Sequence, residues 1–310
     1  MRSRRIVWPS PPLGRSGRTS AVFDNFDQRT GISLTGSHIR DCLNQNNEYR
    51  SALLNVWEVK LSDRLTLSEG DLLRLRRFST PTVYNGWEQI SAVDRRGVVN
   101  REDVRDFMPQ FGAMVGYAVT LEVEPSNPDH LTHKDAPQAY RAYLESVPGP
   151  KIVIVKDADS PGIIGTYVGE VNASLHRALG CVGIITDGGI RDVVEMTSLG
   201  FKALARRLCV GHAYAWPVRW GHEVEVFGLT IRPGELVHAD QHGFMVIPEQ
   251  DQTGVLAATQ FMDANECTSV IEAGQPLRGR SMAETRAAMV EAERRFGEAA
   301  RRQFGKSGEW

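Results

Sequence analysis

Residues 183–192 read GIITDGGIRD, and the segment TYVGEV at 166–171 precedes them. The first four residues of the stretch are apolar or β-branched and predict a buried strand. The next three, DGG, predict a tight turn in which the glycines take positive φ. We expect Arg191 and Asp192 to start a helix after this turn. A guanidinium and a carboxylate would then lie side by side at a strand end, where α/β proteins commonly bind ligands.

A second carboxylate lies upstream, since twenty residues separate Glu170 from Arg191. Two carboxylates around one guanidinium suit a hard divalent cation together with an anionic substrate. Each residue alone has a simpler interpretation. Arg191 and Asp192 would usually form a surface ion pair, and Glu170 would usually be an acid in the first turn of a helix.

Composition limits the classes of function. The chain has 310 residues, 41% of them hydrophobic, and a formal net charge of -2. This balance is ordinary for a globular protein and provides no basic field for nucleic acid. No apolar run reaches the roughly 20 residues that span a membrane. The four cysteines form no CxxC pair, which fits a reducing, cytoplasmic compartment.

We expect three regions along the chain. Residues 1–70 form an N-terminal extension, partly disordered, with a short helix near Gln45–Leu61. Its first twenty residues carry five arginines and no acid, which fits a disordered tail better than a transit peptide because the prolines oppose an amphipathic helix. Residues 71–250 alternate helices and strands and predict one α/β domain. Residues 251–310 form a C-terminal helical arm, in which a capping box at Ser281 starts a helix after Pro276.

Within the middle region, cap residues and hydrophobic periodicity predict the individual elements. Ser68 and Ser79 should cap two helices, and Gly200 should end another. The expected helices are 69–78, 80–90, 136–147, 170–179 and 193–199. The expected strands are 115–123, 151–156, 183–186, 203–205, 223–227, 229–231, 236–239 and 244–247. His238 and His242 flank the last turn at a spacing that metal ligands also show, but we expect a solvated loop there.

Several of these segments together resemble the RraA-like family. That family includes class II 4-hydroxy-4-methyl-2-oxoglutarate/4-carboxy-4-hydroxy-2-oxoadipate aldolases and regulators of ribonuclease activity. The similarity runs from about Leu72 to Pro248, in family order and spacing, through FSTPTVYNGW, VGYAVTLEV, GTYVGEV, GCVGIITDGGIRDVVEMTSLGF and LTIRPGELVHADQHGFMVIP.

The resemblance implies an α/β fold, a swivelling β/β/α sandwich with an N-terminal extension and a C-terminal helix. It also implies homotrimers or homohexamers with active sites at subunit clefts, and a divalent cation, Mg²⁺ or Mn²⁺. Asp192 would contact the cation, and Glu170 would hold a cation-bound water. Arg191 would grip the 2-oxo acid end of the substrate. The backbone amides of Val171 and Asn172 would receive its carboxylate, as helix N-termini do for anions.

Two departures from the family pattern affect the expected substrate. Many of the aldolases have Asp where this chain has Glu170, whose carboxylate reaches one methylene further. The segment Cys209–Trp220, CVGHAYAWPVRW, replaces a Ser/Pro-rich stretch. We expect His212 to join the substrate pocket, and Tyr214, Trp216 and Arg219 are further candidates.

The implied reaction is retro-aldol cleavage of a small anionic 4-hydroxy-2-oxo acid through a pyruvate enolate. Oxaloacetate decarboxylation passes through the same enolate, so one site could catalyse both. A cation-bound water positioned by Glu170 is the expected base. The alternative is a non-catalytic regulator that binds a ribonuclease or RNA-degradation complex. Schiff-base chemistry is disfavoured because no lysine lies near the Arg-Asp pair in sequence.

Overall fold

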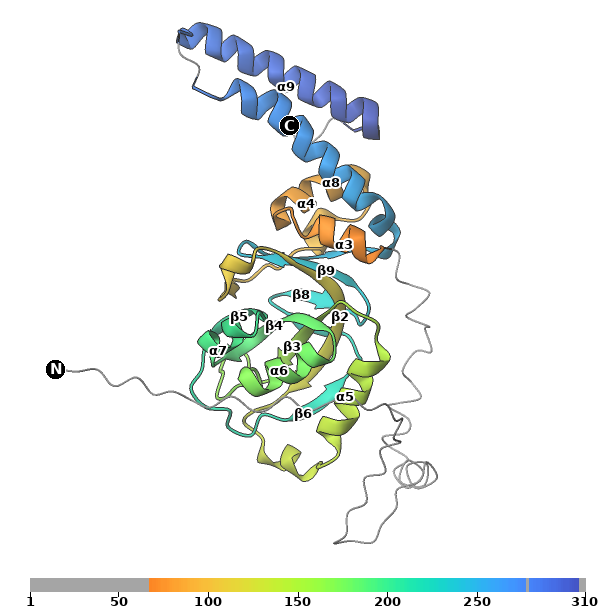
Figure 1. The fold of residues 1–310 in the computed structure, drawn as a ribbon, viewed down its shortest axis with the longest axis vertical. Coiled ribbons are helices and arrows are strands. Elements are labelled where there is room, and N and C mark those ends of the chain that lie inside the picture. Colours follow the sequence, from red (N-terminus) through yellow and green to blue (C-terminus); the bar gives the residue numbers. More distant parts are fainter. Residues whose placement is uncertain (1–66, 277–278, 307–310) are drawn as a thin grey trace, which may run out of the picture. The chain divides into compact units, whose positions relative to one another are not determined.

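A mixed sheet of eight strands forms the centre of the computed structural model, which describes residues 67–276 and 279–306 (Figure 1). The helix expected near Gln45–Leu61 lies outside these residues. The strand order is β1-β5-β4-β3-β2-β9-β10, and β6 also pairs with β2. The strands are β1 Arg105–Asp106, β2 Met114–Val123, β3 Lys151–Asp157, β4 Cys181–Ile190, β5 Lys202–Leu208, β6 Pro217–Trp220, β9 Leu236–Asp240 and β10 Gly243–Ile247; a separate hairpin pairs β7 Val224–Val226 with β8 Leu229–Ile231.

Strands β2 to β5 are parallel neighbours, each joined to the next by a helix. The connecting helices are α5 Ala136–Ser146, α6 Glu170–Ala178 and α7 Val193–Ser198. Parallel strands require such crossovers, so the alternating pattern of the sequence predicted this part correctly. The carboxyl ends of β3, β4 and β5 therefore lie at one edge of the sheet, where ligands usually bind in α/β folds.

Strand β2 is buried on both faces, which explains its nearly continuous apolar sequence. Odd-numbered residues face the helices. Val119 packs in a cluster with α5 and α6, and Val115 packs in a cluster with three further helices, α3 (Glu69–Leu75), α4 (Thr80–Ile90) and α8 (Gln252–Glu266). Even-numbered Met114 and Ala118 face the other way and pack with apolar residues of the β7–β8 hairpin. The curved, nearly closed sheet thus has a core on each side (Figure 1).

The remaining helices begin where the sequence predicts caps. Ser68, Ser79 and Ser281 each accept a backbone hydrogen bond at the start of α3, α4 and α9, and Ser281 forms the expected capping box with Glu284. Helix α8 falls within the helical arm expected at 251–310, but its start and end were not predicted. The helices are α3 Glu69–Leu75, α4 Thr80–Ile90, α8 Gln252–Glu266 with a π-helical continuation Cys267–Ile271, and α9 Met282–Phe304; short 3₁₀ turns occupy Arg95–Gly97, Pro109–Phe111, Pro128–Thr132 and Glu249–Asp251.

Helix α9 packs on α8 through a small apolar cluster that contains Met262, Phe296 and Ala300. Met282, at its start, is 85% exposed. None of the helices in the described part of the chain is long and apolar enough to cross a membrane.

The prediction of a turn at Asp187-Gly188-Gly189 is wrong. Strand β4 continues through these residues to Ile190, with a register irregularity against β5 between Thr186 and Gly189. The glycines are needed for space, since a Cβ on Gly188 would lie 2.6 Å from Asp157 Oδ2 and one on Gly189 would lie 2.8 Å from Cys209 Cβ. Positive φ occurs instead at Asp192, with φ 56°.

The prediction of a solvated loop is also wrong for His238. His238 lies on β9 and is fully buried, and its Nδ1 is 2.9 Å from Thr80 Oγ1. Burial lowers the pKa of His238 to about 4, so the imidazole is neutral at pH 7. Asp240, two residues on, accepts a hydrogen bond from the Thr80 amide at 2.9 Å. These two side chains fasten the start of α4 to the sheet.

Candidate active site

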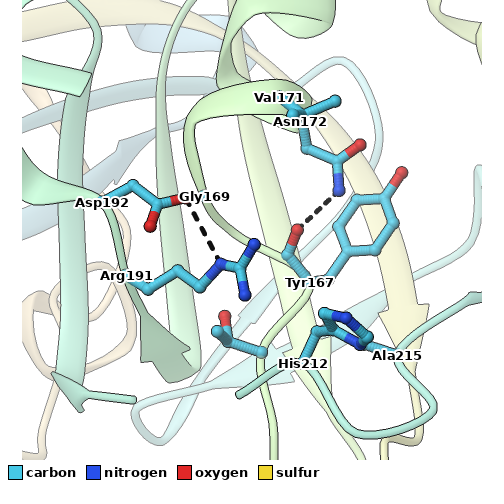
Figure 2. A pocket seen from close by; sticks show the side chains of 9 residues that line it. Tyr167, Gly169, Val171, Asn172, Arg191, Asp192, His212 and Ala215 are labelled. Carbon is cyan, nitrogen blue, oxygen red and sulfur yellow. Dashed lines mark hydrogen bonds and ion pairs between the residues drawn. The ribbon is translucent and has the colours of Figure 1, made fainter. Parts of the chain in front are cut away.

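A pocket of about 140 Å³ opens at the carboxyl edge of the parallel strands. Three segments form it: the loop before α6 with the first turn of that helix, the residues directly after β4, and the loop after β5. Figure 2 shows the Arg191 guanidinium directed between Asp192 on one side and Tyr167 and His212 on the other. The lining residues are Thr166, Tyr167, Gly169, Val171, Asn172, Arg191, Asp192, His212 and Ala215.

Backbone and side-chain hydrogen bonds join the loop before α6 to the end of β4. Val168 bridges Ile190 in parallel fashion, and the Arg191 amide donates to the Val168 carbonyl at 3.0 Å. The Thr166 hydroxyl donates to the Gly189 carbonyl at 2.5 Å. These bonds hold the first turn of α6 next to the residues that follow β4.

Arg191 and Asp192 follow β4 directly, and the left-handed backbone of Asp192 turns its side chain towards α6. Its Oδ2 accepts a hydrogen bond from the Glu170 amide at 3.0 Å and lies 3.3 Å from Arg191 Nε. Asp adopts positive φ more readily than most residues. The Asp192 carboxylate can come this close to α6 because residue 169 is a glycine. A Cβ at that position would lie only 2.6 Å from Asp192 Oδ2.

The first turn of α6 points two unpaired amides at the pocket. The Ala173 amide donates to the Gly169 carbonyl and the Glu170 amide donates to Asp192. The amides of Val171 and Asn172 make no hydrogen bond to another described residue. Free amides and the positive end of the helix dipole favour a bound anion.

The structure brings together five of the six site residues predicted from the sequence. Arg191, Asp192, Val171, Asn172 and His212 all line the pocket. Glu170 does so only indirectly, because its amide contacts Asp192 while its exposed side chain is not part of the lining.

Of the other candidates in the Cys209–Trp220 segment, Trp216 and Arg219 make structural contacts elsewhere, and the side chain of Tyr214 is exposed and does not line the pocket. Trp216 Nε1 donates to the His133 carbonyl at 3.0 Å, and Arg219 pairs with Glu122 at 2.7 Å. Sequence reasoning missed Thr166, whose hydroxyl fastens the loop, and Tyr167. Neither belongs to a charge pattern, so only their place in the GTYVGEV motif could have drawn attention to them.

The lysines considered for Schiff-base chemistry are also occupied elsewhere. Lys151 Nζ donates to the carbonyls of Leu144 and Val147 at the end of α5. Lys202 pairs with Asp106, and Lys156 pairs with Asp187 at 2.6 Å. None of these lysines lines the pocket.

Asp192 offers one free carboxylate oxygen to a divalent cation in this pocket. Among residues 67–276 and 279–306, no group of three or more His, Cys, Asp or Glu side chains is arranged to hold a metal. Asp192 has one oxygen, Oδ2, occupied by protein donors, and its Oδ1 makes no bond to a described residue. Mg²⁺ commonly binds through one or two carboxylates and keeps several waters. The residues therefore fit a cation held by Asp192, substrate and water, and do not fit an all-protein cage.

Comparison with known proteins identifies the family. A sequence profile described as "RraA-like: Aldolase/RraA" matches residues 80–246, more than half of the chain. The chain belongs to the RraA-like family. The profile covers every pocket residue, from the loop before α6 to the loop after β5.

Relatives in this family carry an aldolase name. A protein of Halalkalibacterium halodurans named "Putative 4-hydroxy-4-methyl-2-oxoglutarate aldolase" is 27% identical over 154 residues, 49% of this chain and 68% of that protein. One of Pseudomonas fluorescens with the same name is 32% identical over 114 residues, 31% of this chain and 67% of that protein.

A solved RraA-like structure confirms the expected fold. It is that of Streptomyces coelicolor RraAS2, described as an unusual member of the RNase ES inhibitor RraA protein family. It is 22% identical, with a TM-score of 0.52, and the match covers 65% of this chain and 96% of that one. At this identity the likeness concerns the fold alone.

Proposed function

We propose that this RraA-like chain is a divalent-metal-dependent lyase that cleaves a small anionic 4-hydroxy-2-oxo acid by a retro-aldol reaction. The products are pyruvate and a second carbonyl compound. The same site would also decarboxylate oxaloacetate, since both reactions place negative charge on the oxygen of a pyruvate enolate. The aldolase name of the relatives from H. halodurans and P. fluorescens supports the reaction class.

One observation carries the proposal: a single pocket combines donors for an anion with a carboxylate for a cation. The free amides of Val171 and Asn172 supply two donors to a substrate carboxylate. The Arg191 guanidinium adds a planar fork of donors within the same 140 Å³ space. Asp192 offers Oδ1, which suits a hard cation.

Each residue then has a distinct task. The first turn of α6 orients the substrate carboxylate, so that the adjacent 2-oxo group lies beside Arg191. Arg191 stabilises the charge that develops on the 2-oxo oxygen, as fixed donors do for oxyanions. The ion pair with Asp192 keeps the guanidinium in place before substrate arrives. A Mg²⁺ or Mn²⁺ ion bound through Asp192 would supply Lewis-acid stabilisation of the same charge.

The test measures pyruvate release with a coupled lactate dehydrogenase assay. Oxaloacetate and a series of 4-hydroxy-2-oxo acids would be supplied with Mg²⁺ and, in parallel, with EDTA. We expect pyruvate with Mg²⁺ and a large loss of rate with EDTA. An absence of turnover on every substrate, in protein shown to bind Mg²⁺, would contradict the proposal, and an absence of metal binding as well would favour a non-catalytic regulator.

A further inference from the structure

The loop after β5 is held rigidly over the pocket. The Cys209 amide donates to the Ile190 carbonyl at 2.8 Å, and the Thr166 amide donates to the Gly211 carbonyl at 3.1 Å. The Tyr214 amide donates to the Pro125 carbonyl at 3.1 Å. Between these anchors His212 lines the pocket. The position of His212 is therefore set by the backbone of three separate segments.

Local strain concentrates at this pocket. The described residues contain three non-glycine positions with positive φ, and two of them, Asp192 at 56° and Ala213 at 47°, adjoin it. Left-handed backbone is unfavourable for an alanine, and such strain gathers at functional sites. Gly165 adds a tight contact, since a Cβ there would lie 2.5 Å from the His212 carbonyl oxygen.

One hydrogen bond decides the tautomer of His212. Its Nδ1 lies 2.9 Å from the Ala213 carbonyl oxygen. A carbonyl oxygen can only accept, so Nδ1 carries the hydrogen and Nε2 of the neutral ring carries a lone pair. Nε2 makes no hydrogen bond to another residue in the described part of the chain. The ring is solvent-exposed and therefore accessible to a ligand in the pocket.

Few other lining groups can take up a proton. Arg191 and the amides of α6 are donors only. Burial raises the pKa of Tyr167 well above its ordinary range, so this phenol stays protonated at pH 7. The Thr166 hydroxyl is bonded to the Gly189 carbonyl. This leaves Asp192, whose carboxylate faces Arg191 and the cation site, and the Nε2 of His212.

We propose that His212 is the catalytic base that removes the proton of the C4 hydroxyl. The O–H electron pair forms the new C4 carbonyl as the C3–C4 bond breaks, and the electrons of that bond become the enolate held by Arg191. The imidazolium then returns the proton to C3, which gives pyruvate. This inference rests on the proposed function, and it assigns to His212 the step expected of a water held by Glu170.

Oxaloacetate separates this role from substrate binding. Its decarboxylation uses the same carboxylate, 2-oxo and enolate contacts, but no C4 hydroxyl has to lose a proton. Loss of a general base typically costs about 10²–10⁴-fold in rate. In His212→Gln we expect the ratio of kcat for retro-aldol cleavage to kcat for oxaloacetate decarboxylation to fall by about 100-fold or more. His242→Gln, on the β9–β10 turn outside the pocket, is the matched control and should leave the ratio unchanged.

A second variant tests the chemistry directly. Added imidazole should restore retro-aldol cleavage in His212→Ala by diffusing into the vacated, exposed position, with little effect on decarboxylation. A ratio unchanged in His212→Gln, or both reactions reduced equally with no rescue by imidazole, would overturn the assignment of His212 while leaving the lyase in place. A wild-type chain with neither reaction would instead overturn the proposed function, and this inference with it.

Discussion

The carboxylate of Asp192 accepts a hydrogen bond from the backbone amide of Glu170 at 3.0 Å. This bond joins the end of β4 to the first turn of α6. Asp192 thus caps a helix that begins 22 residues earlier in the chain, and the same oxygen pairs with Arg191. The link fixes the distance between the free amides of α6 and the Arg-Asp pair, on which the proposed chemistry depends.

Substitution of Asp192 should separate its charge from its backbone role. Asn tolerates positive φ and keeps an oxygen that can accept from the Glu170 amide. We therefore expect Asp192→Asn to retain its thermal midpoint while kcat/KM with Mg²⁺ falls by about 100-fold or more, the usual loss when a transition-state contact is removed. Asp192→Ala should in addition lose about 1–3 kcal/mol of stability, from left-handed strain and the lost hydrogen bond. Kinetics and thermal unfolding on both variants would show this, and an active Asp192→Asn would exclude the cation role.

Gly169→Ala should damage the site more than the fold. A Cβ at this position would lie 2.6 Å from Asp192 Oδ2 and 3.1 Å from Arg191 Nε, so both side chains must move. A displacement of about 1 Å can cost 10²-fold in rate. We expect a loss of kcat of that order, measured by pyruvate release. Gly97→Ala, where a Cβ would meet nothing within 4 Å, is the control; equal activity of the two variants would show that the observed arrangement is not the active one.

Asp157 should give the chain an unusual pH dependence of stability. Burial raises its pKa to about 6 from 3.8. Between these values the folded state holds a proton that the unfolded state releases, so stability falls as pH rises from about 4 to about 6, by up to about 1.4 kcal/mol per unit. Asp157→Asn removes this effect and should raise the unfolding midpoint more at pH 7 than at pH 4. Thermal scans across that range would test it against Asp103→Asn, an exposed control; a gain independent of pH would contradict the raised pKa.

The predicted homotrimer or homohexamer should depend on apolar side chains around the pocket. Several large ones are exposed there, and Val210 is 96% exposed. A charge at this position should dissociate the assembly because a buried unpaired carboxylate is strongly disfavoured. Light scattering should give a multiple of the 34.4 kDa chain for the wild type and a smaller mass for Val210→Asp. Leu73→Asp, exposed on α3, is the control, and a monomeric wild type would refute the expectation. The exposed residues are Ile164, Val171, Val194, Leu208, Val210 and Tyr214.

Much of the fold was predictable because its signals are local. Serine caps before α3, α4 and α9 marked the true helix starts. The apolar runs of β2 and β3 reflect strands buried on both faces. Helix α8 lies within the arm expected at 251–310, but its bounds were missed because its sequence, QTGVLAATQFMDANE, has no side-chain cap and its buried face includes the polar residues Gln252 and Thr259.

Most of the expected residues line one pocket, but the geometry of that pocket could not be predicted from the sequence. The family motif pointed to Arg191, Asp192 and the start of α6, which do meet at one pocket. The Asp187-Gly188-Gly189 sequence suggested a turn, whereas the glycines serve close packing between strands and Asp192 adopts the positive φ. Contacts between segments distant in sequence, such as Gly165 with His212, have no local signal.

Binding of oxalate would probe the proposed enolate site itself, because this planar dianion resembles the pyruvate enolate. Calorimetric titration would be performed with Mg²⁺ and with EDTA, on the wild type and on Arg191→Lys, which keeps the charge but loses the planar fork. We expect oxalate binding that requires Mg²⁺ and weakens at least about tenfold in Arg191→Lys, since one charge-assisted hydrogen bond contributes about 1.5–3 kcal/mol. No oxalate binding in the presence of Mg²⁺, or equal affinity in both proteins, would contradict it.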